Sequence, residues 1–430
     1  MIALRKLDYR LFLALLLTQF IPVIYSTMRV YFLGSLPETW GFNIASQVAW
    51  LNLLYEVLTE GLLLPLYFIL GQVTGDSNRF RQRVSVALGV FIGAYGLLSA
   101  FVLTFSDELV VAMEQSEALK IATVSYIRLE SVGLLLSSVY AMTVVILVIL
   151  KHERLLYHLL LFKALLTVVF DSLFVSQFSF SMQLGVNGVA WTNILVNGFM
   201  VAGSLYWLHR LNVLGFTKQG VMEGGWLKQW SMVSARSGLE SLVRNLAFMW
   251  MILKMVNEVE QSGTYWVTNQ FIWGWLLLPV LALGNLIKQD VATHEGNIGT
   301  RMTGYMQLTG LFILLWVLSM PGWQWFIHTI MGIAEFQKIT ELAMLLVIFY
   351  AVFSLNNVLD SYFYGSGRTD LMLYQSLIVN TVFYGGAYLL YLQSIFVPGL
   401  TSIAVLFGLG ITFDALVTLG MYVRVKRQPG

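Results

Sequence analysis

Twelve apolar stretches, each long enough to cross a lipid bilayer, constrain the fold of this chain more than any other feature. A bilayer core about 30 Å thick needs about 20 consecutive apolar residues per helix. Lipid offers the backbone no hydrogen bonds, so such stretches cross it as helices. We therefore predict an all-α polytopic membrane protein with twelve transmembrane helices, at 10–33, 46–70, 84–106, 122–150, 155–178, 185–208, 234–256, 264–287, 302–330, 339–364, 371–394 and 399–423.

The composition agrees with a membrane protein and excludes several other classes. Of the 430 residues, 58% are hydrophobic and 11% are charged, whereas soluble domains contain about 25% charged residues. The net charge of +2 gives no reason to expect a nucleic-acid partner. The sequence contains no cysteine, which excludes disulfides and thiol chemistry. We expect a monomer whose partners are membrane lipids and a small-molecule substrate.

Basic residues are distributed unequally between the two sets of loops. If the N-terminus is inside, the outer loops hold only Lys120, Lys254 and Lys338, and the inner segments hold most of the other basic residues. Cytoplasmic loops are enriched in Lys and Arg. We therefore predict that both termini are cytoplasmic and that the chain is integral to the plasma membrane, which in bacteria is the inner membrane.

The longest inner connection divides the chain into two halves of six spans. We predict an N-terminal lobe at 1–208, a cytoplasmic linker at 209–233 and a C-terminal lobe at 234–430. Both halves then start on the same side of the membrane, which predicts a pseudo-two-fold axis along the membrane normal. Short similarities between the halves agree with a repeat, such as "SQVAW" at 46–50 and "NQFIW" at 269–273.

Four segments resemble the MATE (multidrug and toxic compound extrusion) transporters of the MOP superfamily. They are "RVYFLGSLPETWGFNIASQ", "EGLLLPLYFILGQVTGDSNRFRQR", "VFDSLFV" followed by "LGVNGVAWTN", and "NNVLDSYFYGSGRTD". The resemblance covers essentially the full length of the chain. It implies two six-helix lobes around a V-shaped cavity, and export by alternating access that is coupled to Na⁺ or H⁺.

Ionisable residues remain within the apolar stretches, where they are costly and mark functional sites or structural ion pairs. We expect Arg128 and Glu130 to reach the interface from the outer end of their span. Asp414 stands alone in the last span, and both interpretations stay open for it. The intramembrane bases are Arg29, Arg128, Lys163 and Arg244, and the acids are Glu56, Glu60, Glu130, Asp171, Glu240, Asp360 and Asp414.

The first half departs from the family pattern at Arg29. The resemblance implies a cation-linked aspartate five residues before Gly34, where this chain has Arg29. Asp171 matches the family's aspartate in span five, and Thr167 stands one turn earlier, where an asparagine is common. Asn193 matches a polar position of span six.

Two interpretations of Arg29 stay open. In the first, Arg29 pairs with Asp171 or Glu56 and disables the first-lobe cation site, because a carboxylate held ionised by a guanidinium is a poor proton carrier. In the second, its planar donor fork binds an anionic group of the substrate. The candidate cavity or substrate-binding residues are Arg29, Arg244, Glu56, Thr167, Lys163 and Asn193.

The second half keeps more of a cation site. Asn356 and Asp360 lie four apart on one helical face, and the resemblance assigns Asp360 to the second-lobe cation site, with Asn356 where a tyrosine is found. Glu240 and Arg244 have the i, i+4 spacing of an intrahelical salt bridge, so Glu240 is either the partner of Arg244 or a displaced cation ligand. The candidate coupling residues are Asp360, Asn356, Glu240 and Asp171. We expect Na⁺ or H⁺ as the coupling ion, no cofactor, and no metal other than Na⁺ at Asp360.

The resemblance and the charges favour a cation-coupled exporter of a small organic molecule, which is a drug, toxin or metabolite. Arg29 makes an anionic or zwitterionic substrate one of the options. The alternative is a MOP-superfamily flippase for a lipid-linked or otherwise anionic precursor, which Arg29, Lys163 and Arg244 favour. The sequence has no pore-forming repeat of a channel. It also has no catalytic or metal-binding motif of an enzyme.

Overall fold

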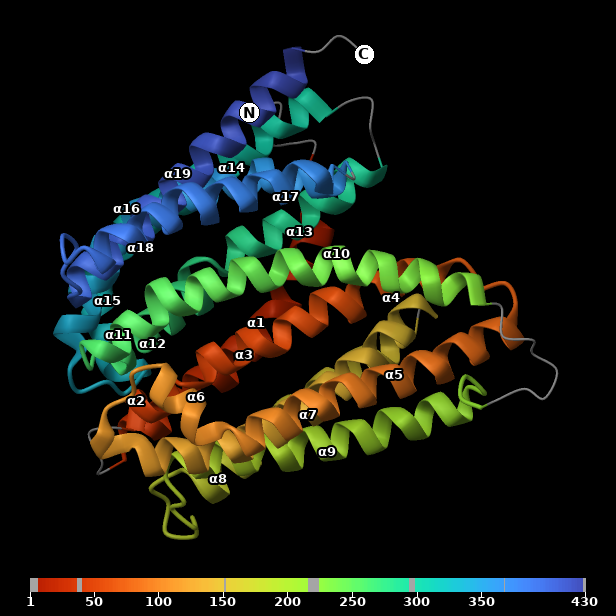
Figure 1. The fold of residues 1–430 in the computed structure, drawn as a ribbon, viewed down its shortest axis with the longest axis horizontal. Coiled ribbons are helices and arrows are strands. Elements are labelled where there is room, and N and C mark those ends of the chain that lie inside the picture. The colour runs from red at the N-terminus through yellow and green to blue at the C-terminus, as the bar shows by residue number, and fades with distance from the viewer. Residues whose placement is uncertain are drawn as a thin grey trace. The chain divides into compact units, whose positions relative to one another are not determined.

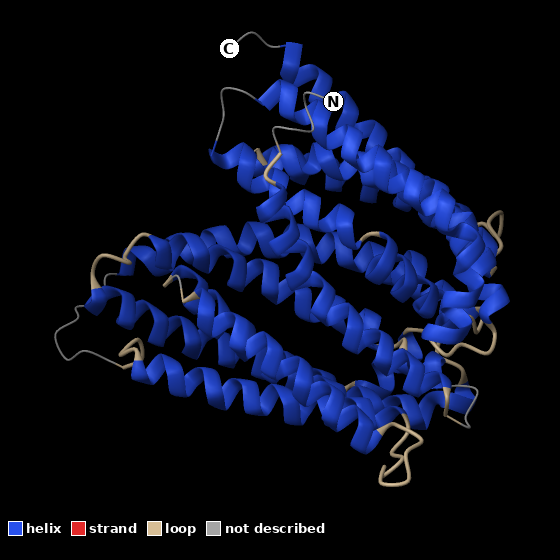
Figure 2. Ribbon diagram, turned by 180° about the vertical axis from the view of Figure 1, so that it is seen from behind, coloured by secondary structure: helices blue, strands red, loops and turns tan. Residues whose placement is uncertain are grey.

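The structure is a computed structural model that describes residues 7–36, 41–150, 152–215, 224–293, 298–366 and 368–427. Within these ranges every regular element is a helix, as Figure 2 shows. Nine helical segments of the described residues are long and apolar enough to cross a membrane, and a bent pair at 262–276 and 278–291 makes a tenth. The chain is therefore an integral membrane protein of the predicted all-α class.

The two predicted spans outside this set, 234–256 and 371–394, are helical too. The first carries many polar residues, and the second is interrupted by a π-helical segment. Each of the twelve predicted stretches thus lies largely in helix. Charged and polar residues within 234–256, and polar residues within 371–394, lower the apolarity of these two segments.

The described helices form two compact units, which we call unit A (36–254) and unit B (1–35 with 255–430). Relative to the predicted lobes 1–208 and 234–430, the first helix of each half packs with the other half. The division into lobes of six consecutive spans, with the linker at 209–233, stays a prediction, since compactness does not measure internal repetition.

Unit A holds the helices between the first span and the middle of the seventh (Figure 1). Helices α7 and α9 pack along each other, and α10 packs on the segment α3–η2–α4. The bounds are α2 Gly41–Ala45, α3 Val48–Leu58, η2 Thr59–Leu63, α4 Leu64–Gly71, α5 Ser77–Thr104, α6 Ser106–Ala112, η3 Glu117–Leu119, α7 Lys120–Ile149, α8 Glu153–Phe174, α9 Val186–Arg210, α10 Gly224–Phe248 and η4 Met249–Leu253.

Unit B holds the first helix and the last five spans. Helix α1 packs on α13, and α16 packs on both α13 and α19. The bounds are α1 Tyr9–Gly34, α11 Lys254–Glu258, α12 Ser262–Phe271, η5 Ile272–Leu276, α13 Leu278–Thr293, α14 Ile298–Ser319, η6 Met320–Gly322, α15 Trp323–Trp325, η7 Phe326–Ile330, α16 Phe336–Gly365, α17 Thr369–Ile378, η8 Val379–Tyr384, α18 Gly385–Leu392 and α19 Leu400–Arg427.

Prolines account for two irregularities in these spans. A proline ring clashes with the carbonyl of the residue four positions earlier and removes one helical hydrogen bond. Pro65 stands two residues after the π-helical turn η2, which contains Gly61, the residue four positions before the proline. Pro279 stands at the break between η5 and α13, where the axis bends by 55°.

Two glycines bring α10 onto η2 at close range within unit A. A Cβ atom on Gly61 would lie 3.3 Å from the Cα of Gly238 and 3.3 Å from the carbonyl oxygen of Ser234. Such distances are tighter than ordinary van der Waals contact, so both helices use glycine where their backbones approach. This close approach positions the charged side chains of α10 and η2 against each other.

Candidate functional site

Two carboxylates from different spans of unit B share one amide group. The Nδ2 of Asn356 donates to Oδ2 of Asp360 and to Oδ2 of Asp414, at 3.0 Å in both cases. Asn356 and Asp360 are one turn apart on α16, and Asp414 belongs to α19. The two carboxylates therefore lie within two hydrogen-bond lengths of each other.

The outer oxygens of the same carboxylates also accept hydrogen bonds. Thr418 Oγ1 donates to Oδ1 of Asp360 at 3.3 Å, and Gln375 Nε2 donates to Oδ1 of Asp414 at 2.6 Å. Thr418 belongs to α19 and Gln375 to α17. Each of the four carboxylate oxygens thus has one donor, and all of these donors are neutral.

The surroundings of this carboxylate pair are largely removed from solvent. Asn356, Gln375 and Thr418 are buried, and Asp360 and Asp414 are half-buried. At an effective dielectric constant of about 20, two unit charges about 5 Å apart repel by roughly 3 kcal/mol. Two carboxylates in this arrangement favour binding of a proton or a metal cation, which removes the repulsion.

One polar atom at the pair has no hydrogen-bond partner among the described residues. It is Oδ1 of Asn356, which is buried in a residue that is only 4% exposed. Leaving a buried acceptor unsatisfied costs about 1–3 kcal/mol. Carboxylate, amide and hydroxyl oxygens are the ligands of hard cations, so Asp360, Asp414, Asn356 and Thr418 could hold Na⁺. The described residues contain no cluster of three or more His, Cys, Asp or Glu side chains that could hold a metal.

The structure thus brings together two predicted coupling residues, Asp360 and Asn356, and adds Asp414. In the sequence Asp414 is an isolated intramembrane acid, because its partners Gln375 and Asn356 stand 39 and 58 positions away on other helices. One local signal was available: Asp414 and Thr418 are one turn apart on α19, so both side chains lie on one helical face.

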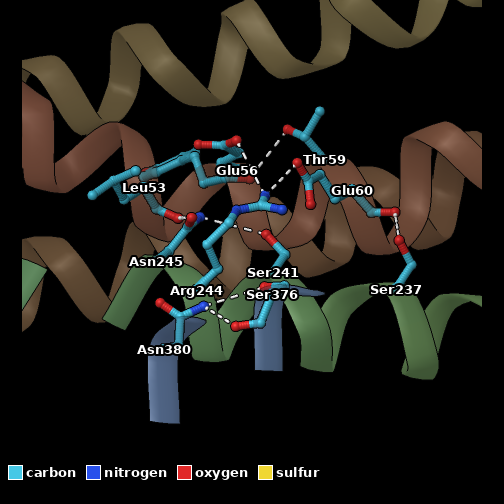
Figure 3. Close-up of polar contacts among 11 residues, drawn as sticks. Leu53, Glu56, Thr59, Glu60, Ser237, Ser241, Arg244, Asn245, Ser376 and Asn380 are labelled. Atoms are coloured by element: carbon cyan, nitrogen blue, oxygen red, sulfur yellow. Dashed lines mark hydrogen bonds and ion pairs between the residues drawn. The ribbon is translucent and has the colours of Figure 1, made fainter. Parts of the chain in front are cut away.

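A second charged cluster lies within unit A, where α10 packs on η2 (Figure 3). The guanidinium of Arg244 lies 2.6 Å from Oε1 of Glu60 and 3.7 Å from Oε1 of Glu56. The side chains of Arg244, Glu60 and Glu56 are 34%, 21% and 42% exposed. Arg244 thus faces two carboxylates, of which Glu56 is the more exposed.

Neighbouring hydrogen bonds fix the helices that carry this cluster. Asn245 Nδ2 donates to the carbonyl of Leu53 at 2.9 Å, and Ser237 Oγ donates to the carbonyl of Glu60 at 2.8 Å (Figure 3). Nearby, the hydroxyls of Thr59 and Tyr95 are 2.7 Å apart. The two described carboxylate partners of Arg244 both come from another helical segment. The side chain of Glu240 lies outside the described part of the structure, so its pairing with Arg244 stays a prediction.

The other predicted residues of the first half occupy separate positions in unit A. Asp171 is buried on α8 at 1% exposure, and Thr167 donates back to the carbonyl of Lys163 at 2.8 Å. The ammonium of Lys163 lies 5.2 Å from the centroid of the Tyr140 ring. Thr167 thus has a contact within its own helix, and Lys163 has an aromatic partner.

Asn193 has a partner that the sequence did not indicate. Its Nδ2 donates to Oε1 of Glu130 at 2.7 Å, and Glu130 is 3% exposed. The expectation that Glu130 reaches the interface is wrong, because its side chain turns into the packing of α7 against α9. Arg128, in contrast, pairs with exposed Asp107 at 2.8 Å.

Arg29 belongs to α1 in unit B and is half-buried. Asp171 and Glu56 belong to unit A. The predicted pairing of Arg29 with either carboxylate stays a prediction, and so does its contact with a substrate anion.

No protein-family model matches the sequence, and no curated protein matches it. Solved structures do match the fold over nearly the whole chain. An inward-facing multidrug resistance MATE family transporter of the MOP superfamily has a TM-score of 0.73 at 15% identity, covering 97% of each chain. The Vibrio cholerae MATE transporter VcmN, as an aspartate-to-asparagine mutant, has a TM-score of 0.71 at 15% identity, covering 98% of this chain and 97% of that chain.

A third structure is a MOP superfamily transporter from Pyrococcus furiosus, with a TM-score of 0.70 at 17% identity, covering 99% of this chain and 97% of that chain. Its description states a reverse polarity of the binding pocket that suggests a different function. The chain therefore has the fold of MATE transporters, as the sequence motifs predicted. At these identities the likeness establishes the fold alone.

Proposed function

We propose that the protein is a secondary active transporter that exports a small organic molecule by antiport with Na⁺ or H⁺, through alternating access. The observation that carries the proposal is the Asp360–Asn356–Asp414 arrangement between two membrane-spanning helices. Ionisable residues at such depth are costly and mark ion pathways or proton relays. A pair of carboxylates held by neutral donors suits reversible cation binding, which antiport requires.

The solved structures with this fold support transport as the general activity. One is described as a multidrug resistance transporter, and the Pyrococcus furiosus protein as a transporter with a reversed binding-pocket polarity. The same fold is thus associated with pockets of different charge, so the substrate class has to be argued from the residues of this chain. We expect the plasma membrane as its location, with both termini cytoplasmic.

The Arg244 cluster supports a substrate that carries a positive charge. Arg244 faces two carboxylates, and Glu56 is the more exposed of them, at 42%. A protonated amine or a quaternary ammonium would find an accessible carboxylate at Glu56. We therefore propose an organic cation or a zwitterion in preference to an anion.

The alternative, a flippase for an anionic lipid-linked precursor, rested on three intramembrane bases. Arg244 is matched by Glu60 and Glu56, and Lys163 lies over the Tyr140 ring. These contacts engage two of the three groups that would have bound a pyrophosphate. They give less support to the flippase than to the exporter.

Transport by reconstituted protein tests the proposal. Proteoliposomes are loaded with the fluorescent cation ethidium or the anion carboxyfluorescein, and a Na⁺ gradient or a pH gradient is imposed. We expect gradient-dependent movement of ethidium by the wild type and its loss in Asp360→Asn, which keeps the shape and removes the charge. Asp370→Asn serves as the control, because Asp370 is an exposed acid that pairs with Arg368. Gradient-independent movement, or movement of carboxyfluorescein alone, contradicts the proposal.

A further inference from the structure

We propose that Asp360 and Asp414 bind a single monovalent cation between them, and that the side-chain amide of Asn356 reverses when the cation binds. The inference rests on the proposed function and specifies how its coupling site works. It makes Asp414 a cation ligand and Asn356 a two-state group.

Geometry limits the pair to one cation. The Nδ2 atom of Asn356 lies 3.0 Å from Oδ2 of each carboxylate, and the outer oxygens are held by Thr418 and Gln375. The two Oδ2 atoms therefore face one common position. An N–H₂ group carries partial positive charge, so it stands where a cation would be stabilised by both carboxylates. A second cation would have to displace the donors on the outer oxygens.

The amide of Asn356 can serve either state of the pair. Its N–H₂ group suits two ionised carboxylates, whereas its oxygen suits a bound cation or the O–H of a protonated carboxyl. The Oδ1 atom is buried and has no hydrogen-bond partner in the part of the chain that the structure describes. The surroundings on that side of the amide therefore do not hold one orientation, and the charge between Asp360 and Asp414 decides which way the amide turns.

A proton and Na⁺ would use the same oxygens and would compete. Bound Na⁺ would have Oδ2 of both carboxylates and Oδ1 of Asn356 as ligands, which are hard oxygen atoms. Two further titratable groups from neighbouring elements of the described structure interact electrostatically with the pair. They are Lys288 of α13, which interacts with Asp360, and Tyr384 of η8, which interacts with Asp414. The ammonium of Lys288 also lies 5.3 Å from the Tyr364 ring centroid.

Binding to purified full-length protein tests the number of cations. Retention of ²²Na⁺ and proton uptake on acidification are measured for the wild type, Asp360→Asn, Asp414→Asn, the double variant, and the control Asp370→Asn. We expect each single variant to weaken binding at least tenfold, and the double variant to weaken it no further. Half the wild-type stoichiometry in each single variant would show two independent sites and overturn the inference.

If Asp414→Asn does not fold, Gln375→Leu replaces it as the test. We expect a several-fold gain in cation affinity in that variant, because Asp414 loses a hydrogen-bond donor. Unchanged affinity in Gln375→Leu overturns the inference too.

Variants of Asn356 test the reversal of the amide. Asn356→Leu removes the oxygen that the reversed amide gives to the bound cation, so we expect weaker binding and faster release of Na⁺. Asn356→Ser keeps a hydroxyl oxygen that can bind the cation, so we expect part of the affinity to recover. Asn380→Leu is the matched control, because that amide donates within its own helix to Ser376. Equal or tighter binding in Asn356→Leu would show that the amide acts only as a donor, which contradicts the reversal.

The binding and transport measurements distinguish a failure of the inference from a failure of the proposed function. If one cation binds as described but no gradient drives ethidium, the inference holds and the proposed function is wrong. If transport is driven by a gradient and Asp414→Asn binds the cation like the wild type, the proposed function holds and the inference is wrong.

Discussion

The guanidinium of Arg244 on α10 lies 2.6 Å from the carboxylate of Glu60 on η2. This ion pair joins two helices of unit A at the point where Gly61 and Gly238 let their backbones approach. The π-helical turn places Glu60 toward α10, and Pro65 follows the turn. Local backbone geometry and an interhelical charge pair thus support each other in this part of the unit.

Replacing Glu60 by Gln should destabilise the fold. Of its two described carboxylate partners, the guanidinium of Arg244 would keep the more distant one, Glu56 at 3.7 Å. Removing one partner of a buried pair costs about 3–5 kcal/mol, and an exposed pair is worth about 0–1 kcal/mol. The half-exposed pair here should cost about 2 kcal/mol, seen as a lower thermal midpoint in detergent. Arg244→Gln added to Glu60→Gln should recover part of the loss. An unchanged midpoint in the single variant contradicts the structural role.

Replacing Glu56 by Gln should weaken binding of a cationic substrate with little change in stability. Glu56 is 42% exposed and only loosely placed against Arg244. Loss of this negative charge should raise the KM for ethidium about tenfold, which corresponds to about 1.4 kcal/mol. Substrate titrations of transport in proteoliposomes measure this. The adjacent Glu60→Gln serves as the comparison, since its effect should fall on stability. If Glu56→Gln leaves the KM unchanged, Glu56 does not contact the substrate.

Replacing Gly61 by Ala should destabilise unit A through the backbone contact alone. The added Cβ would lie 3.3 Å from both the Cα of Gly238 and the carbonyl oxygen of Ser234, and backbone atoms cannot move aside as a flexible side chain can. Overpacking of this kind costs roughly 1–3 kcal/mol. Gly71→Ala is the control, because a Cβ there meets nothing within 4 Å. Equal thermal midpoints of the two variants would falsify the close-contact argument.

The fold was predictable because its signals are local and repeated. Each apolar stretch is continuous in the chain, and lipid restricts it to one conformation. The segments 234–256 and 371–394 were found by the same reasoning, although polar residues such as Arg244 and Asn380 lie within them. In contrast, the packing of α1 with the later spans depends on contacts between distant residues, such as Trp275 donating to Thr27 at 3.0 Å.

The candidate site was predictable only where its residues share a helical turn. Asn356 and Asp360 are four positions apart, so the sequence alone puts them on one face. Asp414 joins them through a hydrogen bond that spans 58 positions, for which the sequence holds no signal. Likewise, the i, i+4 spacing pointed from Arg244 to Glu240, whereas the described partner is Glu60, 184 positions away. Distances between helices decide such partners, and spacing along one helix does not reveal them.

The charge of Arg29 should matter more than its bulk. Asp171 is a carboxylate with 1% exposure on α8, and an ionised carboxylate at such depth requires a counter-charge or a proton. Arg29 stands at the position where the sequence motifs lead one to expect an acid, so it is our candidate for this counter-charge. Arg29→Met, which keeps most of the bulk, should lower both the thermal midpoint and ethidium transport. Adding Asp171→Asn should restore both if ion pairing is the only task of Arg29. Restored stability without restored transport would show that the guanidinium also acts on the substrate. If Arg29→Met alone matches the wild type in both measurements, Arg29 has neither role.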